Sequence, residues 1–599
     1  MISDEEIING FSENTYSVRV RDAALERLKA LRDYLGDSYE KAEEIVKSLE
    51  IDYQGILPLT IRLGNASVLV KDLNELNYML ELLLYRAGID LGPSKTKVLM
   101  TLTNILRDVL EDESLRDPNK CILDGELLRE RNIPAIATEL ANRFRDINNA
   151  KTFYLGDTEL GLYCWNGRKY VECESLALKF LEDNYRLNEL EKYKIRRTLL
   201  AKEFIFALKH STHYQLKYER TMISYNNLVL DWDALLSWDL QNAFKKHNPD
   251  LIIFHHIPHD LNKELILNEL KGLEKYTPPT ISTERLEKLA EKYTPKTLKA
   301  FKVWVGKKWI LLYEIIGAVQ YPKPIKKAFL IYGPTDGGKS TLLKLIMKLI
   351  GKDNYSSVKL QALINPEYRF MTYRIYGKLA NIYADLPISA LRNLGEFKVL
   401  TGGDSIEVER KFRDPFTWNN VYVKFIFSCN KPPKIANLEE ADEAFWRRWL
   451  VVEFPNPIPE DKKIDDFENI LLSEAPNILA ISILAFYNVI RRGYRFSYEN
   501  TAEDAKNKWL SATDSVYAWL LARKNEGVLV EDKTARTESS KLYEDYINWC
   551  ETNEVDEDDR VDQGQFTKRL KRYGLKAVTK ERKTYFMVRL GQSPHKTLG

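Results

Sequence analysis

The chain has 599 residues, of which 44% are hydrophobic and 29% are charged, and its formal net charge is +2. At about 100–200 residues per domain, this length predicts roughly three to five domains with enough apolar residues for several cores. With so small a net charge, any nucleic-acid partner must be met by local basic patches. The five cysteines form no CxxC pair, which argues against a zinc ribbon and a disulfide scaffold and fits a reducing cytoplasm.

No targeting or membrane segment is predicted. The segment MISDEEIING at the start is acidic and lacks the apolar core of a signal peptide. The longest apolar stretches, residues 309–319 and 477–490, are shorter than the roughly 20 residues of a membrane span and are predicted as buried helices. We therefore expect a cytoplasmic protein, in the host cytoplasm if the chain is viral, with no membrane partner.

Residues 1–130 are predicted to be mainly helical, because apolar residues recur at helical spacing in residues 22–36 and 72–89. No acidic pair on a strand indicates a primase site there, and the role of this region is not predicted. Residues 131–280 are predicted as a mixed α+β domain, with a β-hairpin over residues 160–174 around the dipeptide Asn166-Gly167. The pair Pro278-Pro279 predicts a linker.

Three histidines of the second domain, His255, His256 and His259, are close in sequence. No cysteine or acidic residue at ligand spacing accompanies them, which argues against a metal site. Residues 281–325 are predicted as a helical segment that begins at an N-cap, Ser282 or Thr283. Residues 326–500 alternate strand and helix, as in the α/β core of a P-loop protein, and residues 505–599 are predicted as helices followed by a hairpin.

Residues 333–340, GPTDGGKS, match the phosphate-binding pattern GxxxxGK[ST] between an apolar strand-length run and an apolar helix. Glycines let the backbone wrap around a phosphate and aim its N–H groups at it. Lys339 is expected at the β- and γ-phosphates, and the Ser340 hydroxyl is expected to bind Mg²⁺. The predicted nucleotide-binding residues are Gly333, Pro334, Thr335, Asp336, Gly337, Gly338, Lys339, Ser340 and Thr341. The loop alone does not separate a motor from a switch or a kinase.

Three further signals follow in order. Asp385 ends an apolar run 46 residues after Lys339, a normal distance for a metal-side carboxylate, although a strand-end aspartate also caps turns. Asn430 ends the run KFIFSC; an amide there can orient the attacking water, although Asn-Lys-Pro-Pro alone is more often a turn. Arg447 and Arg448 precede the run WLVVEF, where an arginine pair is otherwise a salt-bridge partner.

The segments FKVLTGGDSIEVERKF (397–412), FSCNKPP (427–433) and FWRRWLVVEF (445–454) resemble the signature set of superfamily 3 AAA+ helicases of the virus, phage and plasmid primase–helicase type. The resemblance covers about residues 131–590. It implies a Walker B role for Asp385, with Ser340 as the other Mg²⁺ ligand, and a sensor role for Asn430. It also implies that Arg448, directly before the closing strand, is an arginine finger for the neighbouring subunit's ATP, in preference to Arg447.

The chain departs from that family at one point. The family often has two adjacent acids at the end of the Walker B strand, whereas Ala384 and Leu386 flank Asp385. The identity of the general base is therefore left open.

Two regions are expected to contact DNA. Residues 402–418 predict a hairpin with Lys411, Phe412 and Arg413 at its tip, a composition that suits single-stranded DNA, although an exposed loop is the alternative. Residues 561–590 contain nine lysines and arginines against two acidic residues. They are predicted as the basic part of a winged helix that binds duplex DNA, with a solvated charged face as the alternative. The candidate residues there are Lys568, Arg569, Lys571 and Arg572.

The sequence thus predicts an α/β P-loop protein that binds ATP and Mg²⁺, and the resemblance implies an AAA+ ATPase that is a replicative DNA helicase. By resemblance it is a homohexameric ring that moves 3′→5′ on single-stranded DNA, with residues 281–325 as its collar and a separate primase or polymerase as a potential partner. Two alternatives stay open. Strand displacement on a fork would separate a helicase from an origin-melting initiator, and ATP turnover would separate it from a DNA-binding module with a degenerate ATP site.

Overall fold

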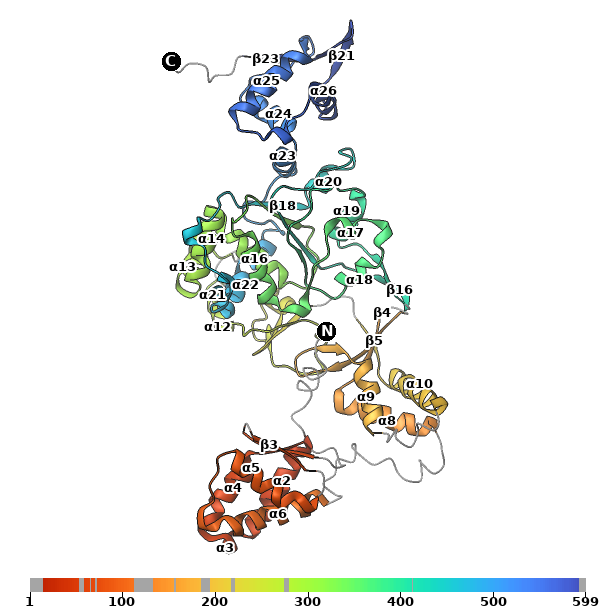
Figure 1. The fold of residues 1–599 in the computed structure, drawn as a ribbon, viewed down its shortest axis with the longest axis vertical. Helices are drawn as coiled ribbons and strands as arrows, with labels where there is room; N and C mark the ends of the chain where they lie inside the picture. The colour runs from red at the N-terminus through yellow and green to blue at the C-terminus, as the bar shows by residue number, and fades with distance from the viewer. Residues whose placement is uncertain are drawn as a thin grey trace. The chain divides into compact units, whose positions relative to one another are not determined.

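The structure is a computed structural model that describes residues 15–52, 59–64, 66–70, 73–111, 133–155, 158–184, 194–216, 221–273, 280–411 and 413–591. The protein is of mixed α/β class and divides into two compact units (Figure 1). Unit 1 is Met1–Lys217 with Asn248–Leu251, and unit 2 is Tyr218–His247 with Ile252–Gly599. The finer division of the sequence into five parts stays a prediction.

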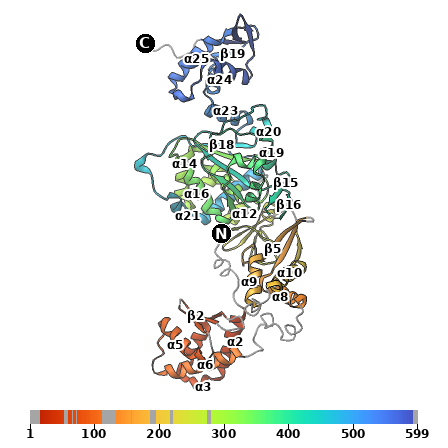
Figure 2. The ribbon, with the colours of Figure 1, turned by 45° about the vertical axis from the view of Figure 1, so that its right-hand side comes forward.

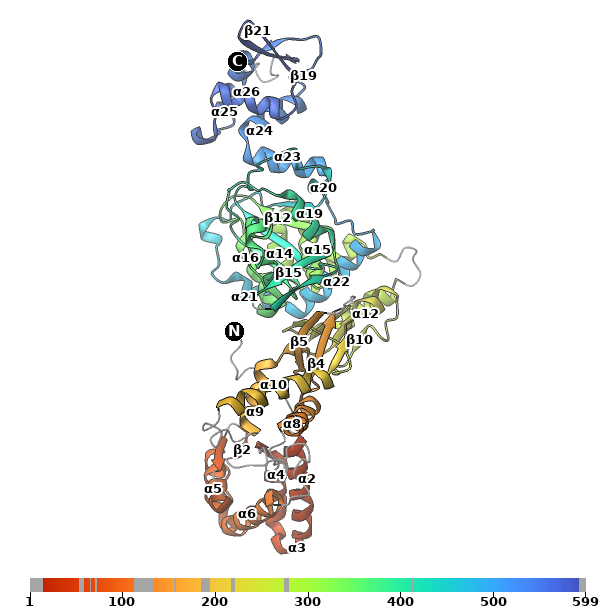
Figure 3. The ribbon, with the colours of Figure 1, turned by 90° about the vertical axis from the view of Figure 1, so that its right-hand side faces the viewer.

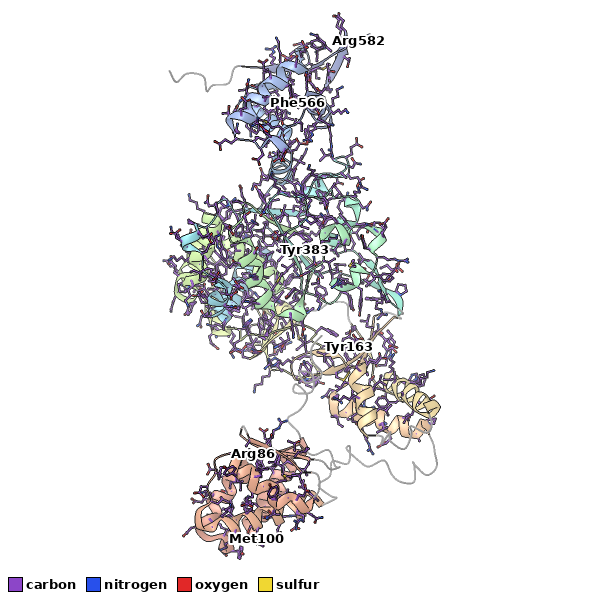
Figure 4. All side chains as sticks on the ribbon, viewed as in Figure 1. Arg86, Met100, Tyr163, Tyr383, Phe566 and Arg582 are labelled. Atoms are coloured by element: carbon purple, nitrogen blue, oxygen red, sulfur yellow. A yellow bond between two sulfur atoms is a disulfide. The ribbon has the colours of Figure 1, made fainter. Side chains whose placement is uncertain are left out.

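The first part of unit 1 packs helices around a three-stranded antiparallel sheet of order β1-β2-β3. The elements are α2 (Thr15–Ala30), α3 (Arg32–Leu35), α4 (Tyr39–Ser48), β1 (Leu49–Asp52), β2 (Leu59–Leu63), β3 (Ala66–Val70), α5 (Leu76–Arg86) and α6 (Lys95–Glu111). Arg86 ties α5 to the sheet, because its Nη1 donates to the carbonyl oxygen of Ser67 over 3.0 Å (Figure 4). The helices agree with the sequence; the sheet was not predicted.

The second part of unit 1 is a four-stranded sheet of order β6-β5-β4-β7 with its own core. Its elements are α8 (Ile133–Asn148), β4 (Lys151–Leu155), β5 (Thr158–Trp165), β6 (Tyr170–Glu172), α9 (Glu174–Asn184), α10 (Lys194–Ser211) and β7 (His213–Gln215). Strands β5 and β6 form the predicted hairpin.

The expectation of no disulfide was wrong for one pair of cysteines. Cys164 and Cys173 form a disulfide, and their Cα atoms lie 5.7 Å apart. The hairpin brings them together, because Cys164 on β5 pairs with Val171 on β6 and Cys173 follows that strand. Both cysteines are buried in the core of this part.

Unit 2 begins with a small sheet of order β10-β9-β8-β11, followed by helices. The elements are β8 (Met222–Tyr225), β9 (Val229–Asp231), α11 (Trp232–Leu236), β10 (Phe244–Lys245), β11 (His256–Ile257), α12 (Lys263–Lys271), α13 (Thr283–Tyr293), α14 (Pro295–Val305) and α15 (Trp309–Val319). Ser282 is the N-cap of α13, as predicted: its hydroxyl oxygen accepts from the Arg285 N–H over 3.1 Å. The pair Pro278-Pro279 lies outside the described residues.

The centre of unit 2 is a five-stranded parallel sheet of order β13-β14-β17-β12-β18. Its strands are β12 (Ala328–Tyr332), β13 (Tyr355–Ser356), β14 (Ala380–Tyr383), β17 (Lys424–Cys429) and β18 (Trp449–Glu453). The connecting elements are α16 (Lys339–Ile350), α17 (Leu360–Leu363), α18 (Met371–Ile375), α19 (Leu394–Gly402), β15 (Ile406–Arg410), β16 (Arg413–Trp418) and α20 (Glu443–Trp446). The runs AFLIY, KFIFSC and WLVVE are mainly apolar and are buried almost throughout, because both faces of central parallel strands are covered.

The two longest apolar stretches of the sequence are buried helices, as predicted. Every residue of α15 is buried, and α15 packs against α22 (Ala475–Arg491), which follows α21 (Phe467–Leu472). Among the described residues no single helix is long and apolar enough to cross a membrane. Residues 460–472 and 475–491 reach that length and apolarity only when counted together across an 81° bend.

The chain ends in a helix–strand–helix–helix–hairpin arrangement (Figure 3). Its elements are α23 (Ala502–Thr513), α24 (Ser515–Asn525), β19 (Leu529–Glu531), β20 (Thr537–Glu538), α25 (Ser539–Thr552), α26 (Gln563–Arg572), β21 (Ala577–Lys580), β22 (Lys583–Phe586) and β23 (Val588–Leu590). Strands β20, β22 and β21 form one antiparallel sheet. Phe566 and Leu570 of α26 are buried in the local core, as their helical spacing predicted (Figure 4).

Candidate nucleotide and DNA site

The glycine-rich loop connects β12 to α16, which is the strand–loop–helix context that its sequence predicted. Gly338 is the N-cap of α16 and has a left-handed φ of 91°. Lys339 is buried, and its Nζ donates to the carbonyl oxygens of Gly333 and Pro334 over 2.8 and 2.5 Å. Ser340 is exposed at the start of the helix.

The residues predicted to act with the loop lie at one edge of the sheet. In a parallel sheet all carboxyl ends share an edge, and ligands of α/β proteins bind there. Asp385 lies two residues beyond β14, is exposed and has φ 53°, and Asn430 directly follows β17 and is exposed. Because β17 lies between β12 and β14, Asn430 leaves the sheet between the loop and Asp385.

The electrostatics agree with this grouping. Burial lowers the pKa of Lys339, while Cys429, Asp385 and Asp336 act in the opposite direction. Burial raises the pKa of the Cys429 thiol to about 12. The Cys429 thiol is therefore neutral near pH 7. The acidic side chains that act on Lys339 are those of Asp385 and Asp336. Asp336 is already paired, with its Oδ2 lying 3.1 Å from Lys463 Nζ.

The residues fit a nucleotide phosphate and Mg²⁺. A Cβ atom on Gly333 would lie 2.1 Å from the carbonyl oxygen of Phe454, so the backbone turns too closely for a side chain there. The exposed hydroxyl of Ser340 and carboxylate of Asp385 are hard oxygen donors, which Mg²⁺ prefers. No second acid adjoins Asp385, and the general base stays unassigned.

Arg448 lies at the opposite edge of the sheet. It directly precedes β18, and its carbonyl oxygen accepts from the N–H of Ala328 at the start of β12. The five residues of each strand separate it from the loop by roughly 16 Å along the sheet. Its guanidinium Nη1 donates to Ala444 O over 2.7 Å. Burial lowers the pKa of Arg448, whereas Asp404 and Asp442 act in the opposite direction.

Arg447 differs from its neighbour in exposure. Its side chain is 65% exposed, and it lies 3.9 Å from the Glu443 carboxylate. Arg448 is half-buried, and its Nε is buried without a hydrogen-bond partner. The choice of Arg448 over Arg447 stays a prediction.

Strands β15 and β16 form the predicted hairpin, and Figures 1 and 2 show β16 at the outer edge of the part of unit 2 that contains the parallel sheet. Lys411 is exposed at the tip. Phe412 lies outside the described residues. Arg413 begins β16 opposite Arg410, and its side chain is likewise not described.

An aromatic and basic segment beside the hairpin was not singled out in the sequence. Residues 366–376 lie between the loop and Asp385, and Arg369 Nε lies 3.2 Å from Glu409 of β15. The ring of Tyr376 packs edge-on against Phe416 of β16, with centroids 4.8 Å apart. The exposed aromatic residues of the segment are Tyr368, Phe370 and Tyr373. The alternation of aromatic and basic residues in PEYRFMTYR could have revealed it.

The four basic residues predicted on α26 are not equivalent. Lys568 and Lys571 are exposed. Arg569 Nη1 lies 3.0 Å from Asp514 Oδ2, and Arg572 Nη2 donates to the carbonyl oxygens of Ile435 and Ala436. The two arginines therefore have protein partners. The hairpin β21–β22 carries Arg582 at its outer tip (Figure 4).

The three neighbouring histidines bond to different partners. His255 is buried, with its Nδ1 3.2 Å from Asn354 Oδ1, whereas His259 Nε2 lies 3.0 Å from the carbonyl oxygen of Lys348. Across the part of the chain that the structure describes, no group of three His, Cys, Asp or Glu residues could hold a metal ion. His255 and His259 instead connect the segment before the parallel sheet to α16 and to the loop after it.

Comparisons with known proteins give a short family match and two distant structures. Residues 331–448, less than half of the chain, match a family of unknown function (DUF5906). The apo structure of the NrS-1 C-terminal region is 15% identical, covers 76% of this chain and 99% of that chain, and has a TM-score of 0.36. The X-ray structure of JCV helicase is 13% identical, covers 60% of this chain and 88% of that chain, and has a TM-score of 0.21. No curated protein matches the sequence. At such identities and TM-scores these likenesses carry no argument about function.

Proposed function

We propose that the chain is an ATP-driven DNA helicase of superfamily 3, built on an AAA+ core. The observation that carries the proposal is the division of its motifs between the two edges of one parallel sheet. Lys339, Asp385 and Asn430 meet at the carboxyl edge, and Arg448 lies at the amino edge. Such a division provides one part of an ATP site at each of two surfaces of the subunit.

At the carboxyl edge the protein's own groups bind and orient the substrate. Lys339 leaves the carbonyl oxygens of Gly333 and Pro334 and turns to the β- and γ-phosphates. Ser340 and Asp385 would hold Mg²⁺, which would neutralise charge on the phosphates. Asn430, between the loop and Asp385, orients the water that attacks the γ-phosphate.

The distance of Arg448 from its own loop supports catalysis between subunits. An arginine side chain does not span roughly 16 Å of sheet, so Arg448 acts on the ATP of the next subunit. Head-to-tail contacts form a ring where the rotation between neighbours closes, and we propose a homohexamer with residues 281–325 in its collar.

The DNA contacts are assigned to two places. Lys411 at the hairpin tip and the exposed aromatic residues of 366–376 suit single-stranded DNA, because rings stack on bases and cations pair with phosphates. The order helix–strand–helix–helix–hairpin at residues 515–586 fits a winged helix. There Lys568 and Lys571 are free to meet duplex phosphates. The 3′→5′ direction, a separate primase or polymerase and a cytoplasmic location belong to this proposal by resemblance.

The test is DNA-stimulated ATP turnover and strand displacement by the full chain. Purified protein is given ATP and Mg²⁺ with and without single-stranded DNA, and then a forked duplex. We expect stimulated turnover, unwinding, and a solution mass of six subunits. Turnover without displacement would indicate an origin-melting initiator instead, and the absence of turnover would refute the ATPase.

A further inference from the structure

Trp304 of α14 lies directly against the phosphate-binding loop, although α14 precedes the ATPase sheet in the chain. A Cβ atom on Gly338 would lie 2.4 Å from the indole Nε1 of Trp304 and 2.6 Å from its Cδ1. Non-bonded heavy atoms are at their closest favourable separation at about 3.5–4.0 Å. The indole therefore fills the space that any side chain at position 338 would need.

The indole is itself held firmly by aromatic neighbours. Trp304 is only 3% exposed. Its ring centroid lies 5.7 Å from that of Phe301 on the same helix and 6.1 Å from that of Phe454, whose plane is inclined by 30°. Burial between two rings leaves the indole little room to change rotamer.

Phe454 connects Trp304 to the other end of the loop. It directly follows β18, and its N–H donates to the carbonyl oxygen of Tyr332, the last residue before the loop. Gly333 passes so close to Phe454 that a Cβ atom there would lie 2.1 Å from its carbonyl oxygen. The stacked pair of Trp304 and Phe454 therefore touches both Gly333 and Gly338.

The conformation of Gly338 decides how the loop presents its donors. Gly338 caps α16 with a left-handed φ of 91°, so its orientation directs the N–H groups of the first helical turn. A glycine loop without support is costly to order, because glycine has the largest backbone freedom to lose. Support that orders the loop before binding raises affinity by removing that cost.

We propose that Trp304 is a positioning residue for the nucleotide: it seats Gly338 in its left-handed conformation and so orders the loop before nucleotide binds. This rests on the proposed ATP function. The proposal adds to that function a residue outside the signature motifs, which lies on a helix of the predicted collar.

The test compares Trp304→Phe and Trp304→Ala with the control Trp309→Phe. Trp309 is also buried, lies on the next helix, α15, and packs against Tyr313 rather than near Gly338. Three quantities are measured on the full chain: the affinity for ADP with Mg²⁺, the KM and kcat for ATP, and the change of tryptophan fluorescence on adding ADP.

We expect Trp304→Ala to raise KM about tenfold while kcat changes less than about twofold, because ordering of the loop affects binding and not the chemical step. Trp304→Phe restores part of the affinity, since a ring still rests near Gly338. The fluorescence change on adding ADP disappears in both Trp304 variants and persists in Trp309→Phe.

The outcomes separate this proposal from the function on which it rests. Wild-type protein that binds no ADP would refute the ATP site, and the proposal with it. Wild-type protein that binds ADP, with Trp304→Phe unchanged in affinity and in fluorescence response, would overturn the role of Trp304 alone. If Trp304→Ala does not fold, the comparison of Trp304→Phe with Trp309→Phe decides. Equal losses in those two variants would also overturn the proposal.

Discussion

Replacing Arg448 with alanine should separate nucleotide binding from hydrolysis. Because Arg448 lies roughly 16 Å along the sheet from its own loop, its loss leaves that loop and its affinity for ADP intact. Hydrolysis should fall about 10³-fold or more, the loss expected when an arginine finger is removed. The hydrogen bond from the charged guanidinium to Ala444 O is also lost, at a cost of about 1.5–3 kcal/mol in stability, so the variant should remain folded.

Mixing variants tests action between subunits. Arg448→Ala keeps an intact loop, and Lys339→Ala keeps an intact arginine, but neither forms a complete site alone. In rings assembled from equal amounts, about one interface in four joins an intact loop to an intact arginine. Mixed rings should therefore recover roughly a quarter of wild-type ATP turnover if the interfaces act independently.

The measurement is ATP turnover against the mixing ratio, with mass measurements to establish that mixed rings form. Turnover should peak at equal amounts. Absence of recovery in demonstrably mixed rings would refute action between subunits. Arg447→Ala is the matched control, since that side chain is 65% exposed and adjacent. If Arg447→Ala loses hydrolysis and Arg448→Ala retains it, the finger is Arg447.

Three further changes have distinct expected results. Lys339→Ala should abolish ATP hydrolysis, because it removes the proposed phosphate contact; normal turnover would contradict the site. Lys411→Ala should leave basal ATP turnover near normal and lower the number of base pairs unwound per ATP. If that number is unchanged, the DNA contact that drives unwinding lies elsewhere. Lys568→Ala with Lys571→Ala should weaken duplex binding and reduce the salt slope by about 2, whereas Arg569→Ala should mainly lower Tm by removing the ion pair with Asp514. If the double lysine variant and Arg569→Ala weakened duplex binding equally, the distinction between DNA-contacting lysines and a structural arginine would be refuted.

The central strands of the parallel sheet could be predicted because their signals are local. AFLIY, KFIFSC and WLVVE are short, mainly apolar runs next to Gly333, Asn430 and Arg448 respectively. The sheet β1-β2-β3 was missed although LTIRLGNASVLV contains a hairpin signal around Gly-Asn. The long helical patterns on either side dominated the interpretation of that region.

Contacts between distant segments were beyond prediction. The hydrogen bonds from Arg572 to the carbonyl oxygens of Ile435 and Ala436 depend on how α26 packs. The sequence of a basic helical face does not reveal which of its cations bond to other protein groups. Trp304 is one of 11 tryptophans, and its contact with Gly338 joins segments that no motif links. The disulfide was missed because Cys164 and Cys173 lie nine positions apart, outside the CxxC spacing that was sought.

The direction of the strands accounts for the arrangement of the site. In a parallel sheet, residues that follow a strand lie at the carboxyl edge and residues that precede one lie at the amino edge. Lys339, Asp385 and Asn430 all follow strands, whereas Arg448 precedes one. The order of motifs along the chain therefore already implies that Arg448 and its own loop lie at opposite edges. Under the proposed function, Arg448 therefore reaches the ATP of a second copy rather than the ATP of its own loop.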